Sequence, residues 1–303
     1  MLSTTIDKYA YISARYLPPF HEHRYRAVWS RIENVSCIEE INHPGIRECL
    51  KFLDIPGVVI NHDGDLPAAS GMGSSSSFIV GLLNVLHALK HESIDKTMLA
   101  REAIYVEQKL VGNIVGNQDQ LAAATGGLNV LMFNETENNF PESSRGPGFQ
   151  VRRLEVPESR KEELESHLLL AFTGFSRNAP EIAKSYQFDL RIMQELYQMV
   201  FEAESRLYIG TMQEFGKMLD YTWRLKKRLS KDISTQYVDY LYEKAIKAGA
   251  LGGKLLGAGG GGFLLLFADP ERQDEIKEAL KGLLFVPFHF ENKGSHIVTN
   301  GVE

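Results

Sequence analysis

The sequence predicts an α+β protein of two domains, and three observations carry that prediction. Strand-like runs and helical patterns are mixed without the repeated strand–helix–strand unit of a doubly wound sheet. A strand, a glycine turn and a long helix follow one another over residues 58–89, and three long helical patterns follow Pro180. With 303 residues, the chain has the length of about two domains.

The N-terminal half is expected to pack strands on a few helices. Alternation of Ile6, Ala10 and Ile12 with polar residues predicts a half-buried strand. Asp95 is the expected N-cap of a helix that reaches Leu110. The other elements expected here are a strand-like run at 24–35, a helix at 43–53, a strand at 58–60, a strand at 128–133, an exposed loop at 134–148, and strands at 151–156 and 168–173.

The C-terminal half is expected to be mainly helical before it returns to strands. Its expected elements are helices at 180–208, 211–229 and 233–248, a strand at 263–267, a helix at 270–283 and a strand-like run at 285–290. The charged run at 160–165 suits a solvated linker or a helix end. We therefore place the domain boundary there, giving domains at 1–160 and 161–303.

Composition narrows the class of protein. With 44% hydrophobic and 24% charged residues, the chain is typical of a globular protein, and its net charge of -6 argues against nucleic acid as a main partner. The two cysteines, Cys37 and Cys49, have no paired spacing and are expected to be reduced core thiols. The start of the chain lacks the apolar segment of a secretory signal, and no apolar run suits a membrane span. We therefore expect a cytoplasmic protein; a homodimer stays open.

Residues 65–77, which we call the glycine–serine loop, are the most informative segment. They lie between an apolar run and a helical pattern whose apolar side chains share one broad face. Gly71 and Gly73 let backbone N–H groups approach an anion closely, and the helix points its positive end at the same place. Serine hydroxyls in the first turn add donors and a candidate Mg²⁺ ligand. A phosphate-binding loop is the hypothesis, and a serine-rich N-cap is the alternative.

Other motifs with glycine and serine do not match this loop. The P-loop requires a lysine, and none follows Gly73. The dinucleotide fingerprint requires a third glycine, where this chain has Ser76. The hydrolase motif G-x-S-x-G cannot be placed on residues 71–77. If a phosphate binds here, a different kind of loop holds it.

Two further segments carry residues suited to phosphate chemistry. Glu107 ends a helical pattern, and Asp119 follows two glycine-bearing turns. One carboxylate suits Mg²⁺, which prefers hard oxygen ligands beside phosphates, and the other could accept a proton from an attacking hydroxyl. Taken singly, either acid is also typical of a solvated surface charge. The glycine run at 259–262, which follows Lys254, is by itself equally typical of a plain turn.

Taken together, these segments resemble the galactokinase–homoserine kinase–mevalonate kinase–phosphomevalonate kinase (GHMP) superfamily. Residues 67–75 match its P-x-x-x-G-L-G-S-S loop, with Met72 in place of leucine. Residues 254–262 match its C-terminal motif K-x-x-G-A-G-G-G-G, and the order and spacing agree. Within the superfamily, the chain is most similar to the D-glycero-α-D-manno-heptose 7-phosphate 1-kinases, through stretches at 3–9, 42–47, 117–127 and 173–177.

The resemblance implies ATP-dependent phosphorylation of the anomeric hydroxyl of a sugar phosphate, with Mg²⁺. It implies an N-terminal domain like domain 2 of ribosomal protein S5, a ferredoxin-like C-terminal domain and a site between them. Two other functions stay open: another anomeric sugar kinase, similar to an L-fucokinase or a galactokinase, or a catalytically impaired sugar- or nucleotide-binding protein of the same fold.

The resemblance also implies roles for individual residues. Ser75 and Glu107 would coordinate Mg²⁺, and Asp119 would orient or deprotonate the C1 hydroxyl. The ATP-binding residues would be Pro67, Gly71, Met72, Gly73, Ser74, Ser75, Ser76, Gly259, Gly260 and Gly261. The substrate-binding residues would be Asp7, Gln118, Asp119, Gly174 and Arg177. Arg177 is the candidate for the distal phosphate, with a plain surface arginine as the alternative.

The chain departs from the superfamily pattern at its start. Members carry a first motif with a strand, an arginine, a glycine-rich turn and an acidic residue. Residues 1–9 of this sequence match the segment just after that motif. The first strand and motif are therefore expected to be missing from the N-terminal domain of this sequence.

Overall fold

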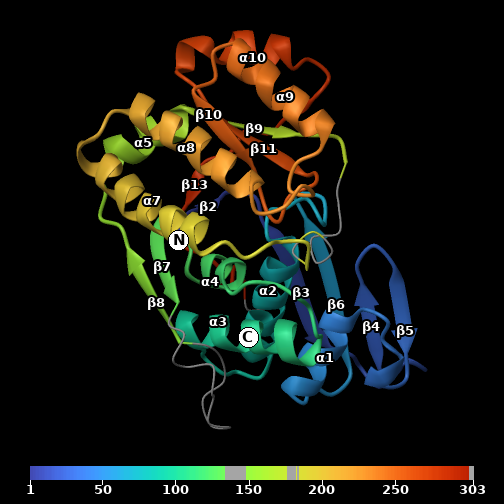
Figure 1. The fold of residues 1–303 in the computed structure, drawn as a ribbon. Coiled ribbons are helices and arrows are strands. Elements are labelled where there is room, and N and C mark those ends of the chain that lie inside the picture. The colour runs from blue at the N-terminus through green and yellow to red at the C-terminus, as the bar shows by residue number, and fades with distance from the viewer. Residues whose placement is uncertain (134–147, 176–181, 183, 300–303) are drawn as a thin grey trace. The chain divides into compact units, whose positions relative to one another are not determined.

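The computed structural model describes residues 1–133, 148–175, 182 and 184–299. The chain forms two compact units (Figure 1). The N-terminal unit contains residues Ser3–Pro67, Gly73–Arg152 and Glu291–Glu303, and the C-terminal unit contains Met1–Leu2, Ala68–Met72 and Arg153–Phe290. The predicted mixture of helices and strands in an α+β fold is confirmed. No helix of the described residues is long and apolar enough to cross a membrane.

A four-stranded sheet and four helices form most of the N-terminal unit. The strand order is β3 (Ala10–Tyr16), β6 (Val58–Gly64), β4 (Tyr25–Val28) and β5 (Ile32–Val35). Ala14 and Ala27 lie opposite Ile60 on neighbouring strands, so these three side chains share one face of the sheet. Helix α2 (Ser74–Leu89) packs against this sheet so closely that a Cβ on Gly81 would lie 2.6 Å from Ile12 Cδ1.

Short helices complete this unit, and their starts follow the sequence. Helix α1 (Pro44–Phe52) begins where His43 Nδ1 accepts a hydrogen bond from the Ile46 N–H, at 3.2 Å. The predicted N-cap at Asp95 is confirmed, because its carboxylate accepts from the backbone N–H groups of Thr97 and Met98. Helix α3 (Lys96–Tyr105) continues as a π-helical turn, η2 (Val106–Leu110), and α4 (Gln118–Thr125) follows. The remaining strands form two small sheets, one of β1 (Leu2–Ser3), β7 (Asn129–Phe133) and β8 (Phe149–Arg153), the other of β2 (Thr5–Ile6) and β13 (Phe290–Glu291).

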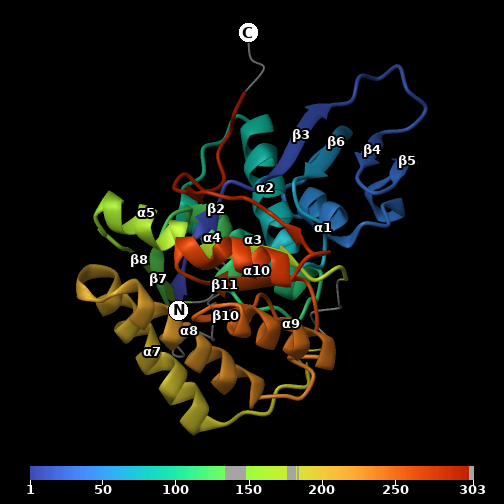
Figure 2. The same cartoon turned by 90° about the horizontal axis from the view of Figure 1, so that it is seen from above.

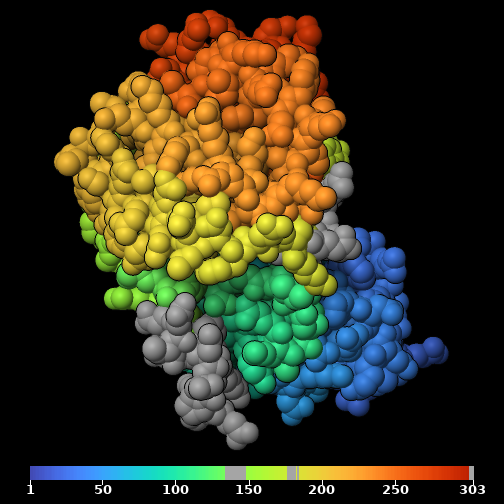
Figure 3. All heavy atoms as spheres, in the orientation of Figure 1, coloured from blue at the N-terminus to red at the C-terminus, as the bar shows by residue number. Residues whose placement is uncertain are grey.

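The C-terminal unit combines an antiparallel sheet with long helices (Figure 2). The strand order is β10 (Gly252–Leu255), β11 (Phe263–Phe267), β9 (Leu168–Phe172) and β12 (Leu284–Phe285). The helices are α5 (Glu158–Ser166), α7 (Leu190–Ile209), α8 (Met212–Lys227), α9 (Gln236–Lys247) and α10 (Gln273–Ala279), with a 3₁₀ turn η4 (Pro270–Arg272). Trp223, Leu264 and Ile276 belong to its buried core. The exposed side chains of α7 include Tyr197 and Phe201. In the space-filling view of Figure 3, the helices of this unit form its yellow and orange surface.

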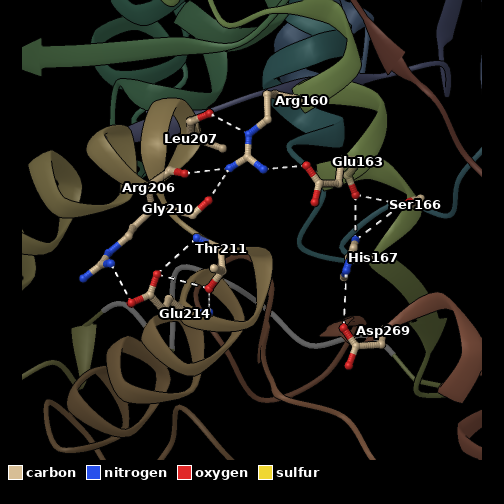
Figure 4. A network of polar contacts seen from close by, with 10 residues as sticks. All are labelled: Arg160, Glu163, Ser166, His167, Arg206, Leu207, Gly210, Thr211, Glu214 and Asp269. Atoms are coloured by element: carbon tan, nitrogen blue, oxygen red, sulfur yellow. Dashed lines mark hydrogen bonds and ion pairs between the residues drawn. The ribbon is translucent and has the colours of Figure 1, made fainter.

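Residues 160–165, expected to form a solvated linker or a helix end, lie within helix α5. The run is helical, and its Arg160 guanidinium donates to the carbonyl oxygens of Arg206 (2.9 Å), Leu207 (3.2 Å) and Gly210 (2.8 Å), as Figure 4 shows. Those carbonyls lie at the C-terminal end of α7, where the last carbonyl groups have no partner within the regular helix. That of Arg206 also accepts from the Gly210 N–H at 3.1 Å. The charges of this run therefore join two helices, and the boundary predicted at residue 160 falls inside α5.

Other differences concern short or irregular segments. The helix expected at 180–208 is interrupted. Ile182 and Lys184 are helical, residues 186–189 are not, and α7 begins at Leu190, where Asp189 caps it through the N–H groups of Arg191 and Ile192. The run expected as one strand at 285–290 forms strands only at its two ends. Cys49 is buried, but Cys37 is exposed, so the expectation of two core thiols was wrong for Cys37. The loop expected at 134–148 lies, except for Gly148, outside the described residues.

Candidate active site

The N-terminal end of α2 carries the second half of the glycine–serine loop. Gly73 is the N-cap and has a φ of 71°, a left-handed backbone that favours glycine. The exposed carboxylate of Asp119, in the first turn of α4, lies beside it. A Cβ on Gly73 would be 3.3 Å from Asp119 Cγ. The first N–H groups of a helix have no partner within the helix and attract anions. This end of α2 therefore combines backbone donors with a potential proton acceptor.

Glu107 provides a buried carboxylate on the same side of this unit. It lies in η2 and is 0% exposed. The Ser75 hydroxyl donates to its Oε1 at 2.6 Å, and the Ser76 hydroxyl and Gln120 Nε2 donate to its Oε2 at 2.9 and 2.7 Å. All three donors are neutral. A buried charge in a protein is usually paired or bound to a metal ion, so this carboxylate fits a cation.

Mg²⁺ fits the donor set around Glu107. The exposed Ser75 hydroxyl and Glu107 Oε1 are hard oxygen atoms 2.6 Å apart. Among the described residues, no group of three His, Cys, Asp or Glu could hold a metal ion. Mg²⁺ does not require such a cage, because it is commonly held by one or two protein ligands together with substrate phosphates and water. The oxygen pair thus suits this ion.

Two histidines pack around Phe78, one turn further along α2. The ring centroids of His43 and His62 lie 5.0 and 4.6 Å from that of Phe78. Burial lowers the pKa of His43, and the neighbouring His62 lowers it further. Burial also lowers the pKa of His62. Both imidazoles are therefore neutral at pH 7 and add no positive charge near this end of α2.

Residues 68–72 of the loop belong to the C-terminal unit and pack on its C-terminal glycine motif. A Cβ on Gly71 would lie 2.6 Å from the carbonyl oxygen of Leu256, and a Cβ on Gly262 would lie 2.1 Å from that of Ser70. The Phe263 N–H donates to the same Ser70 oxygen at 3.2 Å. Ala69 has a φ of 56°, which is strained for a residue other than glycine. Close backbone contacts thus hold this half of the loop in one conformation.

The glycines at 259–261 also pack against neighbouring backbone and side chains. A Cβ on Gly259 would lie 2.5 Å from the Ile233 carbonyl oxygen, to which the Gly260 N–H donates at 2.9 Å. A Cβ on Gly261 would lie 2.6 Å from the ring of Phe175. These contacts explain why glycine is required here without reference to a ligand. The assignment of this run to ATP binding stays a prediction.

The other predicted site residues are distributed over both units. In the N-terminal unit, Ser74 donates to the Pro67 carbonyl at 3.4 Å, the Gln118 side chain lies against Gly116, and Asp7 forms an ion pair with Lys8 at 2.9 Å. In the C-terminal unit, Gly174 follows β9 with a φ of 89°. Met72 ends the C-terminal unit's part of the loop. Arg177 lies outside the described residues.

The sequence analysis missed one residue of this site. Gln120 was quoted within the segment but given no role, although it is 0% exposed and donates directly to Glu107. Its only signal in the sequence is its position, a polar residue directly before the run Leu121 to Ala124. Ser76 was assigned to ATP, yet it is 4% exposed and its hydroxyl also binds Glu107.

Comparison with known families decides the class of protein. Residues 37–127 match the description "GHMP kinases N terminal domain", and residues 201–284 match "GHMP kinases C terminal". The chain belongs to the GHMP kinases. Its GHMP kinase fold also agrees with a solved structure of a D-glycero-D-manno-heptose 1-phosphate kinase from Bacteroides thetaiotaomicron, with a TM-score of 0.75, 24% identity, and coverage of 98% of this chain and 89% of that one.

Curated GHMP kinases are similar in sequence. A D-glycero-α-D-manno-heptose 7-phosphate kinase of Campylobacter jejuni is 28% identical over 72% of this chain and 63% of its own length. An L-fucokinase/L-fucose-1-P guanylyltransferase of Bacteroides fragilis is 28% identical over 79% of this chain and 25% of its own length. The chain thus spans less than two thirds of these two relatives.

Proposed function

We propose that this protein is an ATP-dependent sugar 1-kinase that phosphorylates D-glycero-α-D-manno-heptose 7-phosphate at its anomeric hydroxyl, giving the 1,7-bisphosphate. The observation that carries the kinase proposal is the arrangement at the start of α2, where Ser75 and Glu107 form an oxygen pair and Asp119 lies beside Gly73. The heptose is supported by the similarity to the Campylobacter jejuni relative and by the stretches at 3–9, 42–47, 117–127 and 173–177.

Phosphoryl transfer depends mainly on positioning and on stabilising charge on the transferred group. The N–H groups at the start of α2, with the glycine–serine loop and residues 259–261, would bind the triphosphate of ATP. Ser75 and Glu107 would hold Mg²⁺, which neutralises phosphate charge when bound. Asp119 would orient the C1 hydroxyl and accept its proton. Asp7, Gln118, Gly174 and Arg177 would contact the sugar phosphate.

Asp119 is suited to accept a proton because of where it stands. Its carboxylate is exposed, whereas that of Glu107 is buried and already accepts three hydrogen bonds. An exposed carboxylate can be reached by the hydroxyl of a substrate and accept its proton, and a buried carboxylate is usually paired or bound to a metal ion. We therefore assign Asp119 to the substrate hydroxyl and Glu107 to the metal ion.

A panel of sugars tests the proposal. ADP release is measured with Mg²⁺ and ATP on D-glycero-α-D-manno-heptose 7-phosphate, the unphosphorylated heptose, L-fucose and galactose, and ³¹P NMR identifies the product. We expect the heptose 7-phosphate to be preferred and the new phosphate to be on C1. A guanidinium such as that of Arg177 would bind the distal phosphate through charge-assisted hydrogen bonds. The unphosphorylated heptose lacks this phosphate, so we expect it to be a much poorer substrate.

The same assay separates the alternatives. Equal efficiency on L-fucose or galactose would assign the protein to another class of anomeric sugar kinase, a candidate that the Bacteroides fragilis relative supports. Binding of ATP without turnover on any sugar would favour a catalytically impaired binding protein. Phosphate on a carbon other than C1 would contradict the proposal.

A further inference from the structure

Three side chains donate hydrogen bonds to Glu107, and these bonds are divided unevenly between its two carboxylate oxygens. Gln120 Nε2 and the Ser76 hydroxyl both donate to Oε2, at 2.7 and 2.9 Å. Oε1 receives only the Ser75 hydroxyl, at 2.6 Å. Two donors occupy one oxygen of the carboxylate, and the other oxygen lies next to an exposed hydroxyl. The two hydrogen bonds to Oε2 therefore orient the carboxylate.

We propose that Gln120 and Ser76 are positioning residues that fix the rotation of Glu107, so that its Oε1 and the Ser75 hydroxyl face the metal together. This inference rests on the proposed function, in which Ser75 and Glu107 hold Mg²⁺. Neither Gln120 nor Ser76 would touch the ion. Both would act through Glu107, as hydrogen-bond partners of metal ligands commonly do.

The amide of Gln120 is oriented toward Glu107 at a cost. The opposite orientation would place its oxygen against the Glu107 carboxylate, so Nε2 must be the atom that faces it. As a result, Gln120 Oε1 is buried and has no hydrogen-bond partner among the described residues. An unsatisfied buried acceptor is unfavourable. The position thus gives up a hydrogen bond at Oε1 while it keeps the one to Glu107.

The starts of two helices share this arrangement. In α2, Ser75 is exposed and Ser76 is buried. In α4, Asp119 is exposed and Gln120 is buried. Neighbouring residues in a helix point about 100° apart, since a turn holds 3.6 residues. Each helix therefore has one exposed residue of the proposed chemistry, followed by a buried residue that donates to Glu107 Oε2, while the exposed Ser75 also donates to Oε1.

The test measures metal binding without turnover. Mn²⁺ serves as a paramagnetic substitute for Mg²⁺, and its affinity is measured by electron paramagnetic resonance with a non-hydrolysable ATP analogue. We expect Gln120→Met, which keeps the size of the side chain and removes the donor, to weaken Mn²⁺ binding roughly 10–100-fold. Ser76→Ala should weaken it in the same direction. Gln120→Met should leave the affinity for metal-free nucleotide unchanged.

Gln213→Met is the matched control. Gln213 Nε2 also donates to a carboxylate, that of Asp269, at 2.7 Å, but it lies in α8 of the C-terminal unit. The control should bind Mn²⁺ like the parent. Circular dichroism establishes that each variant is folded, and if Gln120→Met does not fold, Ser76→Ala carries the test.

Glu107→Gln separates this inference from the proposed function. If Glu107→Gln weakens Mn²⁺ binding and neither Gln120→Met nor Ser76→Ala does, the positioning role is wrong and the metal assignment stands. If Glu107→Gln binds Mn²⁺ like the parent, or the parent binds no Mn²⁺–nucleotide, the metal assignment fails and this inference fails with it.

Discussion

Asp119 and Glu107 differ in environment more than their spacing suggests. In the sequence, Glu107 ends a helical pattern and Asp119 follows two glycine-bearing turns. Both were chosen as site residues because carboxylates suit phosphate chemistry. In the structure, the Glu107 carboxylate is enclosed by donors, whereas Asp119 is exposed at the start of α4. Burial and partners, not residue type, decide which acid is suited to which role.

Asp119→Asn should therefore affect chemistry and not binding. The amide keeps the shape of the side chain but cannot accept the proton of the C1 hydroxyl, so kcat should fall roughly 10²–10⁴-fold. Binding of ATP, measured by calorimetry, should stay close to that of the parent. Asp274→Asn, which changes an exposed carboxylate on α10, is the control and should have the parent's kcat. An unchanged kcat in Asp119→Asn would remove this residue from the mechanism.

The site residues that could be predicted from the sequence are those within a recognisable motif. Gly71, Gly73 and Ser75 have the spacing of such a motif, so a role in phosphate binding could be predicted for them from the sequence alone. Gln120 has no such spacing, and its role depends on a bond to a residue thirteen positions earlier. A pairwise contact of this kind is a property of the fold, and no local pattern encodes it.

At the scale of elements, strong periodicity predicted well and short segments did not. Helix α2 was expected because a broad apolar face over residues 78–89 is a long signal. The short apolar run at 58–60 predicted only the start of β6, which extends to Gly64. Strand β10 was missed because two of its four residues are glycine, which is depleted in strands. Helix α4 was missed because it spans only 8 residues between glycine turns. Tertiary packing stabilises both, and the sequence window does not contain that packing.

Gly126 lies where two segments of the chain pack closely. Gly126, which ends α4, has a φ of 67°, and a Cβ there would lie 2.1 Å from the Gly294 backbone nitrogen. Gly126→Ala should destabilise the protein by about 2–4 kcal/mol, the sum of left-handed strain and overpacking. Gly112→Ala is the control, since Gly112 has a φ of 79° but a Cβ would meet nothing within 4 Å. Urea unfolding measures both, and an equal loss in the two variants would show that the close contact adds nothing.

His87 gives α2 a pH-dependent link to its neighbours. Its Nε2 lies 2.7 Å from the Glu102 carboxylate and its Nδ1 lies 2.9 Å from that of Glu92. The hydrogen bond with Glu102 raises the pKa of His87 most, burial opposes it, and Glu92 raises it further. The folded-state pKa therefore lies above the unfolded value of about 6.5. The resulting stability is complete below that value and is lost as the pH rises through the folded-state pKa.

We expect the difference in unfolding free energy between the parent and His87→Gln to be greatest near pH 6 and to shrink toward pH 9. Urea unfolding across this range measures it. His62→Gln is the control of opposite sign, because burial lowers the pKa of His62 and its contribution is instead lost as the pH falls. A difference that does not change with pH would show that the His87 cluster has no titrating role.

At the scale of the whole molecule, the chain is interleaved between its units. Residues Ala68–Met72 belong to the C-terminal unit, and residues from Glu291 onward belong to the N-terminal unit. The sequence analysis placed two contiguous domains at 1–160 and 161–303. Changes in composition along a chain can indicate a linker, but they do not indicate that a later segment packs on an earlier unit. Several of the contacts that join the C-terminal segment to the N-terminal unit are hydrogen bonds to backbone groups, which carry no sequence signature.

The returning C-terminal segment should therefore be required for the stability of the N-terminal unit. The Gly127 N–H donates to the Glu291 carbonyl at 2.8 Å, the Ser295 N–H donates to the Ala123 carbonyl at 2.8 Å, and Thr5 Oγ1 donates to the Glu291 carbonyl at 2.7 Å. A chain that ends at Phe290 loses all three bonds. Each lost hydrogen bond costs about 1 kcal/mol. About 1 kcal/mol shifts the melting temperature of a unit of roughly 150–250 residues by about 2–4 °C, so we expect the melting temperature to fall by roughly 6–12 °C.

Hydrogen exchange locates the effect of this truncation. The Gly127 amide should exchange faster in the chain that ends at Phe290, because it loses the Glu291 carbonyl and keeps only Thr5 Oγ1, at 2.8 Å, as an acceptor. The Phe263 amide, bonded to Ser70 within the C-terminal unit, should keep its rate. A chain that ends at His296 retains all three bonds and is the control. Unchanged melting together with unchanged exchange at Gly127 would show that the N-terminal unit does not depend on the returning segment.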